Sequence, residues 1–436
     1  MNRIESTTSN SQIEELLYQS GAFQRKPRKL SATTFLRGLL ASFLEDTPTL
    51  ERMAGMFELT SGHPYTKQAV QKRMNGGTIN FLMSLFRLLM HQTAGQGLSP
   101  GLFAPFRRVL VQDSTCITLP KCYESLYPGS DNQHGTNAVM KLQLIMDMIS
   151  GHIAELSIAS YRRNDQAATG DIFSVARDGD LVLRDLGYFC YDSFRKMTEQ
   201  NIFFISRLCG QVPVIDPESS VSVELSKTLA QTDGIFDRVM LLGKKQKIPV
   251  RVVAIPVPES VVQARRRKAF RGKDRRHTPQ EERLRLMSWN IVITNIPDTL
   301  LSSEQVVEAY YFRWRIEIIF KAWKSMLKLE KLNFRSVRML HISILQKLLL
   351  CVFCQDAAWA MEIAHGNIQR HVSILRMARI VQDSRPLFLA CFLRIPVEKL
   401  LAFRLFKHAF YEVRKNRKNF MERIYEKPGN RSDSLG

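Results

Sequence analysis

Apolar and polar residues alternate at helical spacing between Tyr310 and Lys324. The stretch contains neither proline nor glycine, and its apolar residues recur every three or four positions, which predicts one continuous amphipathic helix. At about 100° per residue, four polar side chains share one narrow stripe of this helix: Tyr310, Arg313, Glu317 and Lys324. The stripe alone is compatible with a solvated charged face as well as with a functional surface.

The first hundred residues have helical patterns. Residues 1–30 are polar and end in a basic cluster, so we interpret them as a flexible basic arm suited to phosphate contact. Residues 31–100 contain a helix, a short turn at Gly62 and a second, basic helix, which is the outline of a helix-turn-helix DNA reader. We therefore interpret 31–100 as a helical DNA-binding domain, although any small helical bundle has the same outline.

The periodicity changes to that of strands after residue 105. Three strand-like runs come first and alternating helix and strand patterns follow, an order that predicts an α/β fold with a mixed sheet. We assign 105–210 and 298–340 to this core, and 211–297 to a β-strand insertion domain with a basic loop. Residues 341–436 are helical again and form a candidate dimerisation region. Their most apolar run, Leu348 to Cys354, is too short to span a bilayer.

The chain is strongly basic, with 62 Lys and Arg against 41 Asp and Glu and a net charge of +21. Such an excess favours a polyanionic partner, most simply nucleic acid, with an anionic membrane as the lesser alternative. The charge is concentrated between 261 and 285, where ten basic residues accompany three acidic ones. We interpret this loop as a contact to the DNA backbone, with a solvated charged loop as the alternative. The candidate contact residues are Arg265, Arg266, Arg267 and Lys268.

Several classes of enzyme lack their sequence signatures in this chain. Neither a P-loop nor a GxGxxG motif is present, and the histidines do not have the spacing of a zinc hydrolase. Cys351 and Cys354 form a CxxC pair inside an apolar run without a second pair, so we interpret them as core residues. The seven scattered cysteines and the polar N-terminal residues indicate a reducing cytoplasm, because a secreted disulfide framework would need a different pattern.

Three acidic residues from separate elements are candidates for metal binding. Asp113 lies inside an apolar strand, where a carboxylate is costly unless it is paired or bound to a cation. Asp185 ends a short buried strand, at the edge where α/β sheets place site residues. Glu317 projects from the amphipathic helix described above. Together these carboxylates could hold two Mg²⁺ ions, one beside an attacking oxygen and one beside a leaving oxygen.

The polar stripe also has a spacing that is similar to a known signature. Its pattern, Tyr-x2-Arg-x3-Glu-x6-Lys, matches the YREK signature of the insertion-sequence-4 family of DDE transposases, which includes the transposon-5 and transposon-10 relatives. The segments DSTCITL around Asp113 and LVLRDLGYF around Asp185 resemble the two aspartate segments of that family. The further acidic residues that often follow the second aspartate are absent. The resemblance covers residues 105–335.

This resemblance implies a role for each matching residue. Asp113, Asp185 and Glu317 would be the metal-binding catalytic triad of an RNase H-like domain, with two Mg²⁺ ions that Mn²⁺ can replace. A core position is an alternative for one further candidate, Trp289, because this residue borders a strand. The implied DNA contacts are Tyr310, Arg313 and Lys324 on the phosphates, and Trp289 and Trp314 on a flipped-out base.

The resemblance further implies a cut-and-paste DNA transposase in the bacterial cytoplasm, associated with the nucleoid. Such an enzyme cleaves the transposon ends, through a hairpin intermediate, and joins them to target DNA. Its expected partners are double-stranded DNA and a second copy of the chain, and no membrane. Two alternatives remain open at this point: a catalytically inactive DNA-binding protein derived from a transposase, and an RNase H-like nuclease without strand transfer.

Overall fold

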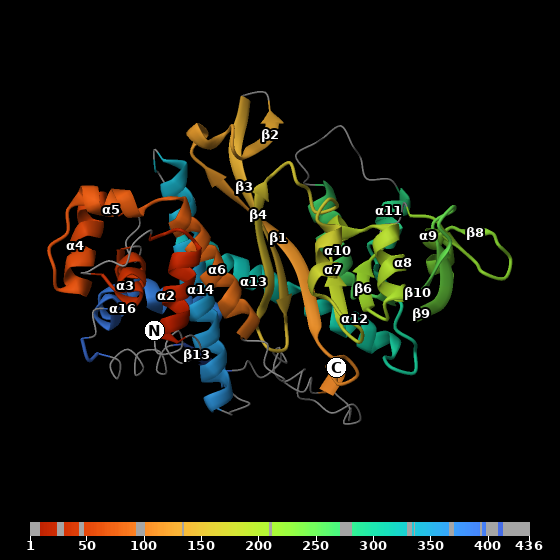
Figure 1. The fold of residues 1–436 in the computed structure, drawn as a ribbon. Helices are drawn as coiled ribbons and strands as arrows, with labels where there is room; N and C mark the ends of the chain where they lie inside the picture. The colour runs from red at the N-terminus through yellow and green to blue at the C-terminus, as the bar shows by residue number, and fades with distance from the viewer. Residues whose placement is uncertain are drawn as a thin grey trace.

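The computed structural model arranges most of the chain around one large sheet (Figure 1). The N-terminal helices and the long helix α14 (Val337–His365) lie toward one end of this sheet, and the strands that follow residue 212 lie toward the other. The described residues are 9–23, 30–42, 48–92, 101–132, 135–208, 212–270, 281–328, 334, 336–365, 370–392, 395–397 and 409–412.

Five strands form the central part of the sheet in the order β4-β3-β1-β5-β6. Strand β1 pairs antiparallel with β3, and β3 pairs antiparallel with β4, whereas β1, β5 and β6 are parallel. This order is that of an RNase H-like core, so the predicted fold class is confirmed. The strands are β1 (Val109–Leu119), β3 (Gly135–Asp147), β4 (Ile153–Ser160), β5 (Leu181–Arg184) and β6 (Phe203–Arg207), with β2 (Pro128–Asn132) paired to β3.

The register of β1 and β5 sets the position of two predicted site residues. Gln112 pairs with Arg184, so Asp113 and Asp185 are the next residues of two neighbouring parallel strands. The two strands lie in the middle of the sheet because both carry continuous apolar runs that are buried on both faces. The fold therefore delivers these two carboxylates to the same edge of the sheet.

The strands of the predicted insertion continue the core sheet. Strand β11 pairs antiparallel with β6, and β10, β9, β7 and β8 follow outward to complete an eleven-stranded sheet. The sequence predicts β9, β10 and β11 but not β7 or β8, and it does not predict the partners of these strands, because pairing between distant strands leaves no local signal. The strands are β7 (Val214–Ile215), β8 (Ser222–Val223), β9 (Phe236–Leu242), β10 (Ile248–Pro256) and β11 (Trp289–Thr294).

The described parts of the basic stretch between β10 and β11 are helical, where the sequence predicts a loop. Helix α10 (Glu259–Phe270) carries the four predicted contact residues, and α11 (Glu281–Leu286) precedes β11. Residues 259–270 contain no glycine or proline and are rich in Gln, Ala, Arg and Lys, which favour helices. Gly272 and Pro279, which suggested a loop, lie outside the described residues.

The predicted continuous helix through the polar stripe is in fact two helices. Helix α12 (Ser303–Tyr311) and helix α13 (Trp314–Leu327) meet at a turn of two residues. In this turn the N–H of Arg313 bonds to the carbonyl of Tyr310, three residues back, as in a 3₁₀-helix. The tighter turn rotates the side chains of α12 relative to those of α13, so the polar residues do not form one exposed stripe.

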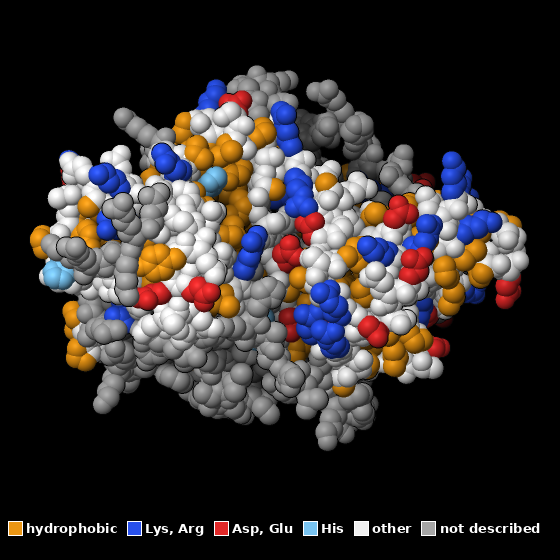
Figure 2. All heavy atoms as spheres, in the orientation of Figure 1, with side chains coloured by type: hydrophobic (Ala, Val, Ile, Leu, Met, Phe, Trp, Pro, Cys, Tyr) orange, Lys and Arg blue, Asp and Glu red, His pale blue; other side chains and the backbone are white. Residues whose placement is uncertain are grey.

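Charged side chains of both signs share the face seen in Figure 2. Acidic and basic groups lie side by side over the middle of this face, next to an apolar area. Several are paired, as in the ion pair of Arg163 with Asp171 at 2.6 Å. This face is therefore not uniformly basic, although the whole chain carries a net charge of +21.

Helix α2 (Asn10–Gln19) corrects the prediction of a flexible arm over residues 1–30. Ile13 and Leu17, one helical turn apart, are buried in the core of the N-terminal helices. Two apolar residues four positions apart are enough to dock a short helix, although its remaining residues are mostly polar. The basic cluster of the predicted arm, at 24–29, lies outside the described residues.

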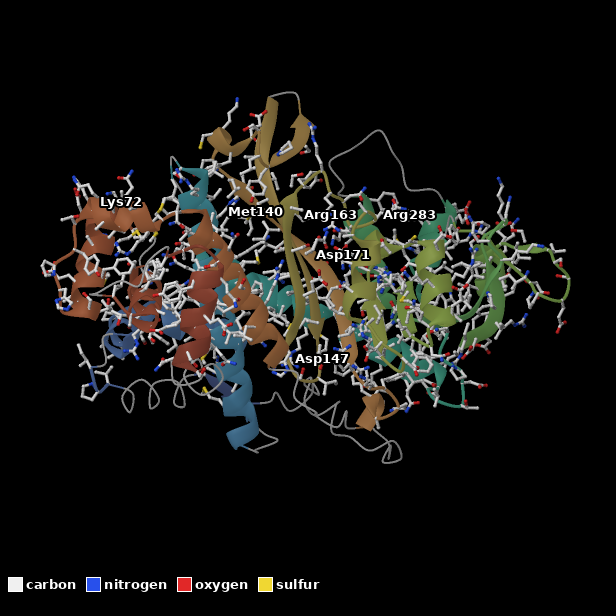
Figure 3. The ribbon with its side chains drawn as sticks, in the orientation of Figure 1. Lys72, Met140, Asp147, Arg163, Asp171 and Arg283 are labelled. Atoms are coloured by element: carbon white, nitrogen blue, oxygen red, sulfur yellow. The ribbon has the colours of Figure 1, made fainter. Side chains whose placement is uncertain are left out.

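The remaining N-terminal helices confirm the helical interpretation of 31–100 in the part that is described. Gly62 ends the first helix of the predicted helix-turn-helix in the left-handed conformation, with φ of 71°. Lys72 projects from the second helix (Figure 3). The helices are α3 (Ala32–Ser42), α4 (Leu50–Ser61), α5 (Lys67–Arg73) and α6 (Gly76–Gln92).

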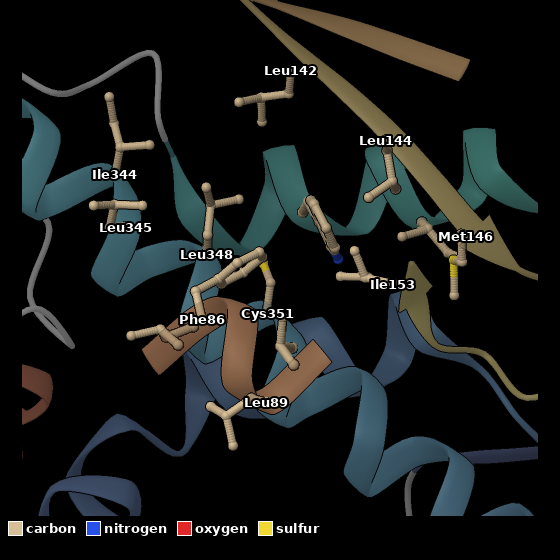
Figure 4. Packing of buried hydrophobic residues seen from close by; sticks show 14 of the residues in the cluster. Phe86, Leu89, Leu142, Leu144, Met146, Ile153, Ile344, Leu345, Leu348 and Cys351 are labelled. Atoms are coloured by element: carbon tan, nitrogen blue, oxygen red, sulfur yellow. The ribbon is translucent and has the colours of Figure 1, made fainter. Parts of the chain in front are cut away.

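The long helix α14 joins the N-terminal helices to the sheet. Leu345, Leu348 and Cys351 of this helix pack against α6 and β3 (Figure 4). Its segment Val337–Gln355 is long and apolar enough to cross a membrane by length and composition, but 61% of it is buried inside the protein, as in a core helix. After α14 come α15 (Ile374–Asp383), α16 (Arg385–Phe392) and two short paired strands that the sequence does not predict, β12 (Arg370–Val372) and β13 (Phe410–Glu412).

The docking of α2 gives a first testable prediction. Leu17→Ala removes a side chain that is only 1% exposed, so we expect the free energy of unfolding to fall by about 2–4 kcal/mol. Urea denaturation measures the change. Glu15→Ala, on the exposed side of the same helix, is the matched control and should leave the midpoint nearly unchanged. Equal midpoints for Leu17→Ala and the wild-type protein would show that α2 does not contribute to the core.

Helices α7 (Ile172–Val175), α8 (Tyr191–Glu199) and α9 (Leu225–Ala230) complete the described α-helices. Among them, α8 connects two parallel strands, β5 and β6, and its Phe194 and Met197 are buried. These residues belong to a second apolar cluster that is separate from the cluster beneath α13. The sheet is therefore covered on both faces, which leaves its carboxyl-terminal edge as the place for polar groups.

Candidate active site

Three acidic side chains from three elements influence one another at this edge of the sheet. Asp113 belongs to β1, Asp185 follows β5 and Glu317 lies in the first turn of α13. Burial raises the pKa of Asp113 to about 6, and the charges of Asp185 and Glu317 contribute to the rise. The structure therefore brings the three predicted carboxylates into one electrostatic neighbourhood.

The guanidinium of Arg313 lies between two of these carboxylates. Its Nη1 donates to Asp113 Oδ2 at 3.1 Å, and its Nη2 donates to Glu317 Oε1 at 3.0 Å. Arg313 is buried, and burial works against its charge, but neighbouring Tyr310 and the acids around it raise its pKa. A buried ion pair of this kind holds β1 and α13 at a fixed separation, because breaking it would leave an uncompensated charge.

Tyr310 contacts the remaining carboxylate. Its hydroxyl donates to Asp185 Oδ1 at 3.3 Å from the last turn of α12. Burial raises the pKa of Tyr310 well above its usual value, so this phenol stays protonated and remains a donor at neutral pH. Tyr310 and Arg313 thus face the carboxylates and are buried, whereas the stripe in the sequence is compatible with a solvated charged face as well as with a functional surface.

These carboxylates provide the right donors for a divalent cation of the Mg²⁺ type. Mg²⁺ prefers carboxylate oxygens, and two acids that already share one cation, the Arg313 guanidinium, are close enough to share another. In the arrangement observed, no group of three His, Cys, Asp or Glu side chains among the described residues is gathered tightly enough to hold a metal ion. The donor set fits a metal ion, provided that Arg313 moves from between its two acids.

The other predicted contact residues lie at the surface around this site. Lys324 is exposed near the end of α13, and the Trp314 side chain is 54% exposed at its start. Trp289 is half-buried at the start of β11 and packs beside the second apolar cluster. Trp289 therefore has a partial core role, because one side of the residue packs on apolar neighbours.

Arg265 donates its hydrogen bonds to groups of the protein, which corrects the prediction that it simply contacts the DNA backbone. Its guanidinium donates to the carbonyls of Met287 and Trp289 at 3.0 Å each, and to Asn290 Oδ1 at 2.6 Å. Asn290 in turn donates to the hydroxyl of Tyr311 at 2.7 Å. This chain of hydrogen bonds connects α10 to the start of β11 and to the end of α12.

The other three predicted residues of α10 differ in their exposure. Arg267 and Lys268 are exposed, whereas Arg266 is half-buried. Their position on a helix spaces their charges regularly along one element, which a loop would not do. Arg267 and Lys268 therefore present their charges to solvent in the observed conformation, whereas Arg266 is partly covered.

Arg207 is a cation beside the site that the sequence analysis did not identify. It ends β6, and because Arg184 pairs with Ser206, Arg207 is in register with Asp185. Burial raises the pKa of Tyr310, and the charges of Arg313 and Arg207 oppose this rise, which places Arg207 close to the phenol. The signal available in the sequence was a single arginine after an apolar run, which is too common to be informative.

The sheet and its carboxylates correspond to a known family. The model of the family described as "Transposase DDE domain" matches residues 104–353, which is more than half of the chain. The chain therefore belongs to this family of transposases. Members generally use divalent metal ions, in agreement with the acidic residues at the sheet edge.

Individual relatives come from bacteria. The transposase for insertion sequence element IS231B of Bacillus thuringiensis subsp. berliner is 27% identical over 421 residues, which cover 87% of each chain. The transposase for insertion sequence element IS1151 of Clostridium perfringens is 27% identical over 308 residues, 66% of this chain and 65% of that one. A solved piggyBac transposase synaptic complex with hairpin DNA has 9% identity, a TM-score of 0.39 and coverage of 91% and 81%, a similarity from which nothing follows for this chain.

The raised pKa of Asp113 predicts a pH-dependent stability. The folded protein binds this proton more tightly than the unfolded chain, since the pKa rises from 3.8 to about 6. Stability from this group is therefore lost as pH rises from about 4 to about 6. Asp113→Asn should remove this pH-dependent loss, which is on the order of 1–3 kcal/mol in the metal-free wild-type protein.

Urea unfolding in EDTA at pH 4.5 and pH 7 measures this effect. The exposed Asp178→Asn variant is the control, and it should follow the wild-type protein at both pH values. If Asp113→Asn and the wild-type protein lose the same stability between the two pH values, the pKa of Asp113 is not raised in the folded protein.

Proposed function

We propose that this chain is the transposase of a bacterial insertion sequence, which binds the terminal inverted repeats and catalyses end cleavage and strand transfer. The observation that carries the proposal is the convergence of Asp113, Asp185 and Glu317, from three separate elements, at one edge of the sheet. Membership of the transposase DDE domain family supports the same reaction. We also propose the insertion-sequence-4 type, because the spacing of Tyr310 to Lys324 matches its signature.

The proposed catalytic residues are acids that would hold metal ions. Asp113, Asp185 and Glu317 would bind two Mg²⁺ ions, with Mn²⁺ as a substitute. When bound, these ions would make an oxygen nucleophile reactive and would neutralise charge on the oxygen that leaves phosphorus. Before metal binds, the contacts of Arg313 and Tyr310 described above would keep the acids apart and in place.

The residues around the carboxylates would position the DNA. Phosphates near the scissile bond would bind Arg313, once it leaves its acids, together with Tyr310, Lys324 and Arg207. Arginine and lysine side chains beside a cleavage site supply charge-assisted hydrogen bonds to phosphate oxygens. Further along the DNA, the backbone would contact the exposed pair Arg267 and Lys268 and the half-buried Arg266.

The two tryptophans would hold an extruded base if cleavage passes through a hairpin, as we propose. Trp314 presents more than half of its side chain to solvent, and a flat exposed indole is a stacking surface for a base. Trp289 would act from the other side, held by the hydrogen bond from Arg265 to its carbonyl. Arg265 would then support the base pocket and would not itself contact the DNA backbone.

The outer regions would serve DNA recognition and assembly. We propose that residues 31–100 bind the inverted repeat, with Lys72 on the exposed side of α5, and that 341–436 contribute to a homodimer on paired ends. A bacterial cytoplasmic location beside the nucleoid follows from such a role. A membrane has no place in it, since the apolar segment of α14 is mostly buried.

A cleavage and joining assay tests the proposal. The substrate is labelled double-stranded DNA that ends in the inverted repeats flanking the gene, with Mg²⁺ and a target plasmid. We expect both cut ends and joined product, and a loss of about 10³-fold or more in Glu317→Gln, because a ligand of the reacting centre is removed. The exposed Glu282→Gln variant on α11 is the control.

Two outcomes of this assay would contradict the proposal. Cleavage by Glu317→Gln at the wild-type rate would contradict the proposal that the three acids are the catalytic residues. Cut ends without any joined product from the wild-type protein would indicate a nuclease and not a transposase.

The phosphate contacts give a separate prediction on salt dependence. Arg207→Ala and Lys324→Ala should each reduce the slope of log affinity against log salt by about 0.9, as expected for the loss of one phosphate contact. Fluorescence anisotropy at several salt concentrations measures the slope. Lys245→Ala, exposed in the turn between β9 and β10, is the control and should keep the wild-type slope. Wild-type slopes in both Arg207→Ala and Lys324→Ala would contradict the proposed contacts.

A further inference from the structure

Asp165 forms the centre of a polar network behind the first carboxylate. Its Oδ1 accepts three hydrogen bonds, from Ser114 Oγ at 2.7 Å, Lys141 Nζ at 3.0 Å and Gln143 Nε2 at 3.1 Å. Ser114 belongs to β1, and the other two donors belong to β3. A single carboxylate outside the sheet therefore fastens the two central strands from one side.

This network lies on the face of the sheet opposite to Asp113. Successive residues of a strand point to opposite faces, so Ser114 points away from the face that Asp113 occupies. Gln143 is the direct cross-strand partner of Ser114, and Lys141 is the partner of Cys116, two residues further on. Asp165 thus holds the position of β1 at the residue next to Asp113 without entering the site.

The same carboxylate also touches the segment after Asp185. A Cβ atom at Gly187 would lie 3.1 Å from Asp165 Oδ2, so this glycine leaves room for the Asp165 side chain. The next residue, Tyr188, is fully buried, and its hydroxyl donates to Gln143 Oε1 at 2.5 Å. Asp165 and its hydrogen-bond partner Gln143 therefore contact the segments of both aspartates.

The turn that carries Asp165 is fastened to the same two strands a second time. Gln112 Nε2 donates to the carbonyl of Ala168, and Arg184 Nη2 donates to the carbonyl of Thr169, both at 2.7 Å. Gln112 and Arg184 are buried cross-strand partners, and each directly precedes one of the two aspartates. The turn from 164 to 171 accordingly bridges β1 and β5 just before their carboxylates.

An ion pair supports this turn at its ends. Figure 3 shows Arg163 and Asp171 close together in the middle of the molecule, and Arg163 Nη2 lies 2.6 Å from Asp171 Oδ1. This pair stabilises the turn itself, but neither residue bonds to β1 or β5 in the contacts described. It offers a matched comparison, since its loss affects the same turn without removing the carboxylate at the centre of the network.

The charge of Asp165 is stable at neutral pH. Burial raises its pKa, but the hydrogen bonds from Ser114, Lys141 and Gln143 outweigh burial, and the pKa lies below its usual value. Lys141 is itself buried, at 5% exposure, and Asp165 is the partner of its ammonium group. Removal of the carboxylate would leave a buried cation, the buried amide of Gln143 and the half-buried hydroxyl of Ser114 to find new partners.

We propose that Asp165 is a positioning residue, which fixes the segments of Asp113 and Asp185 relative to each other so that both can hold the same metal ions. This inference rests on the proposed function, since it assumes that these aspartates are metal ligands. Asp165 does not touch the reacting atoms. No local pattern distinguishes Asp165 from the other acids of its polar segment, because its partners come from strands distant in the chain.

The test compares Asp165→Asn with Asp171→Asn and follows metal binding as well as cleavage. Mn²⁺ binding to the full-length protein with its end DNA is measured by electron paramagnetic resonance, and cleavage is measured across Mn²⁺ concentrations. We expect Asp165→Asn to weaken Mn²⁺ binding by about 10- to 100-fold, the usual effect of losing a residue that orients metal ligands. DNA affinity in the absence of metal should stay at the wild-type value.

Gly187→Ala perturbs the same contact from its other side. The added Cβ would press on Asp165 Oδ2, so this variant should also require more Mn²⁺ for half-maximal cleavage. Asp171→Asn should lower the thermal midpoint but keep the wild-type Mn²⁺ requirement. If Asp165→Asn does not fold, Gly187→Ala and Asp171→Asn provide the same comparison.

Two results would overturn the inference. One is wild-type Mn²⁺ affinity in both Asp165→Asn and Gly187→Ala. The other is an equal loss of Mn²⁺ affinity in Asp171→Asn, which would reveal a general effect of the turn. Glu317→Gln separates this inference from the proposed function: if it cleaves normally, the proposed function fails. If Glu317→Gln is inactive while Asp165→Asn and Gly187→Ala both behave as the wild-type protein, only the role of Asp165 fails.

Discussion

The structure depends on how three like charges are held together at one edge of a sheet. Asp113, Asp185 and Glu317 repel one another in a partly buried place, and the pKa of Asp113 rises to about 6, mainly through burial. The Arg313 guanidinium offsets part of this repulsion from between Asp113 and Glu317. The same arrangement favours a cation of higher charge, because a divalent ion would offset two of the three negative charges, whereas the Arg313 guanidinium offsets only one.

The rest of the fold can be understood as support for this edge. Parallel pairing of β1 and β5 brings two aspartates to neighbouring positions, and α13 carries the glutamate against them. On the opposite face, the turn around Asp165 is hydrogen-bonded to the same two strands through Ser114 and Arg184. A site that must keep its charges close needs rigid strands on which to place them, and a sheet covered on both faces supplies that rigidity.

The sequence predicted those features that local patterns encode, and missed those that depend on distant partners. Apolar runs identified the longer strands, and the places of Asp113 and Asp185 in and after such runs made these two acids candidates. The spacing of polar residues singled out Glu317 together with Tyr310 and Arg313. The same spacing could not reveal the 3₁₀ turn at Arg313, nor that this side chain faces inward, because both follow from packing on the sheet. Arg207 and Asp165 were missed because their importance comes only from strand pairing, and α2 because two buried residues in a polar segment are a weak pattern.

We expect divalent metal to replace Arg313 among the three carboxylates when DNA is bound, and anomalous diffraction from crystals of the protein with end DNA and Mn²⁺ can show this exchange. Mn²⁺ peaks should lie in contact with Asp113, Asp185 and Glu317, with Arg313 turned away to a phosphate. Mn²⁺ peaks elsewhere, or Arg313 still bridging Asp113 and Glu317 in the presence of DNA and metal, would contradict it.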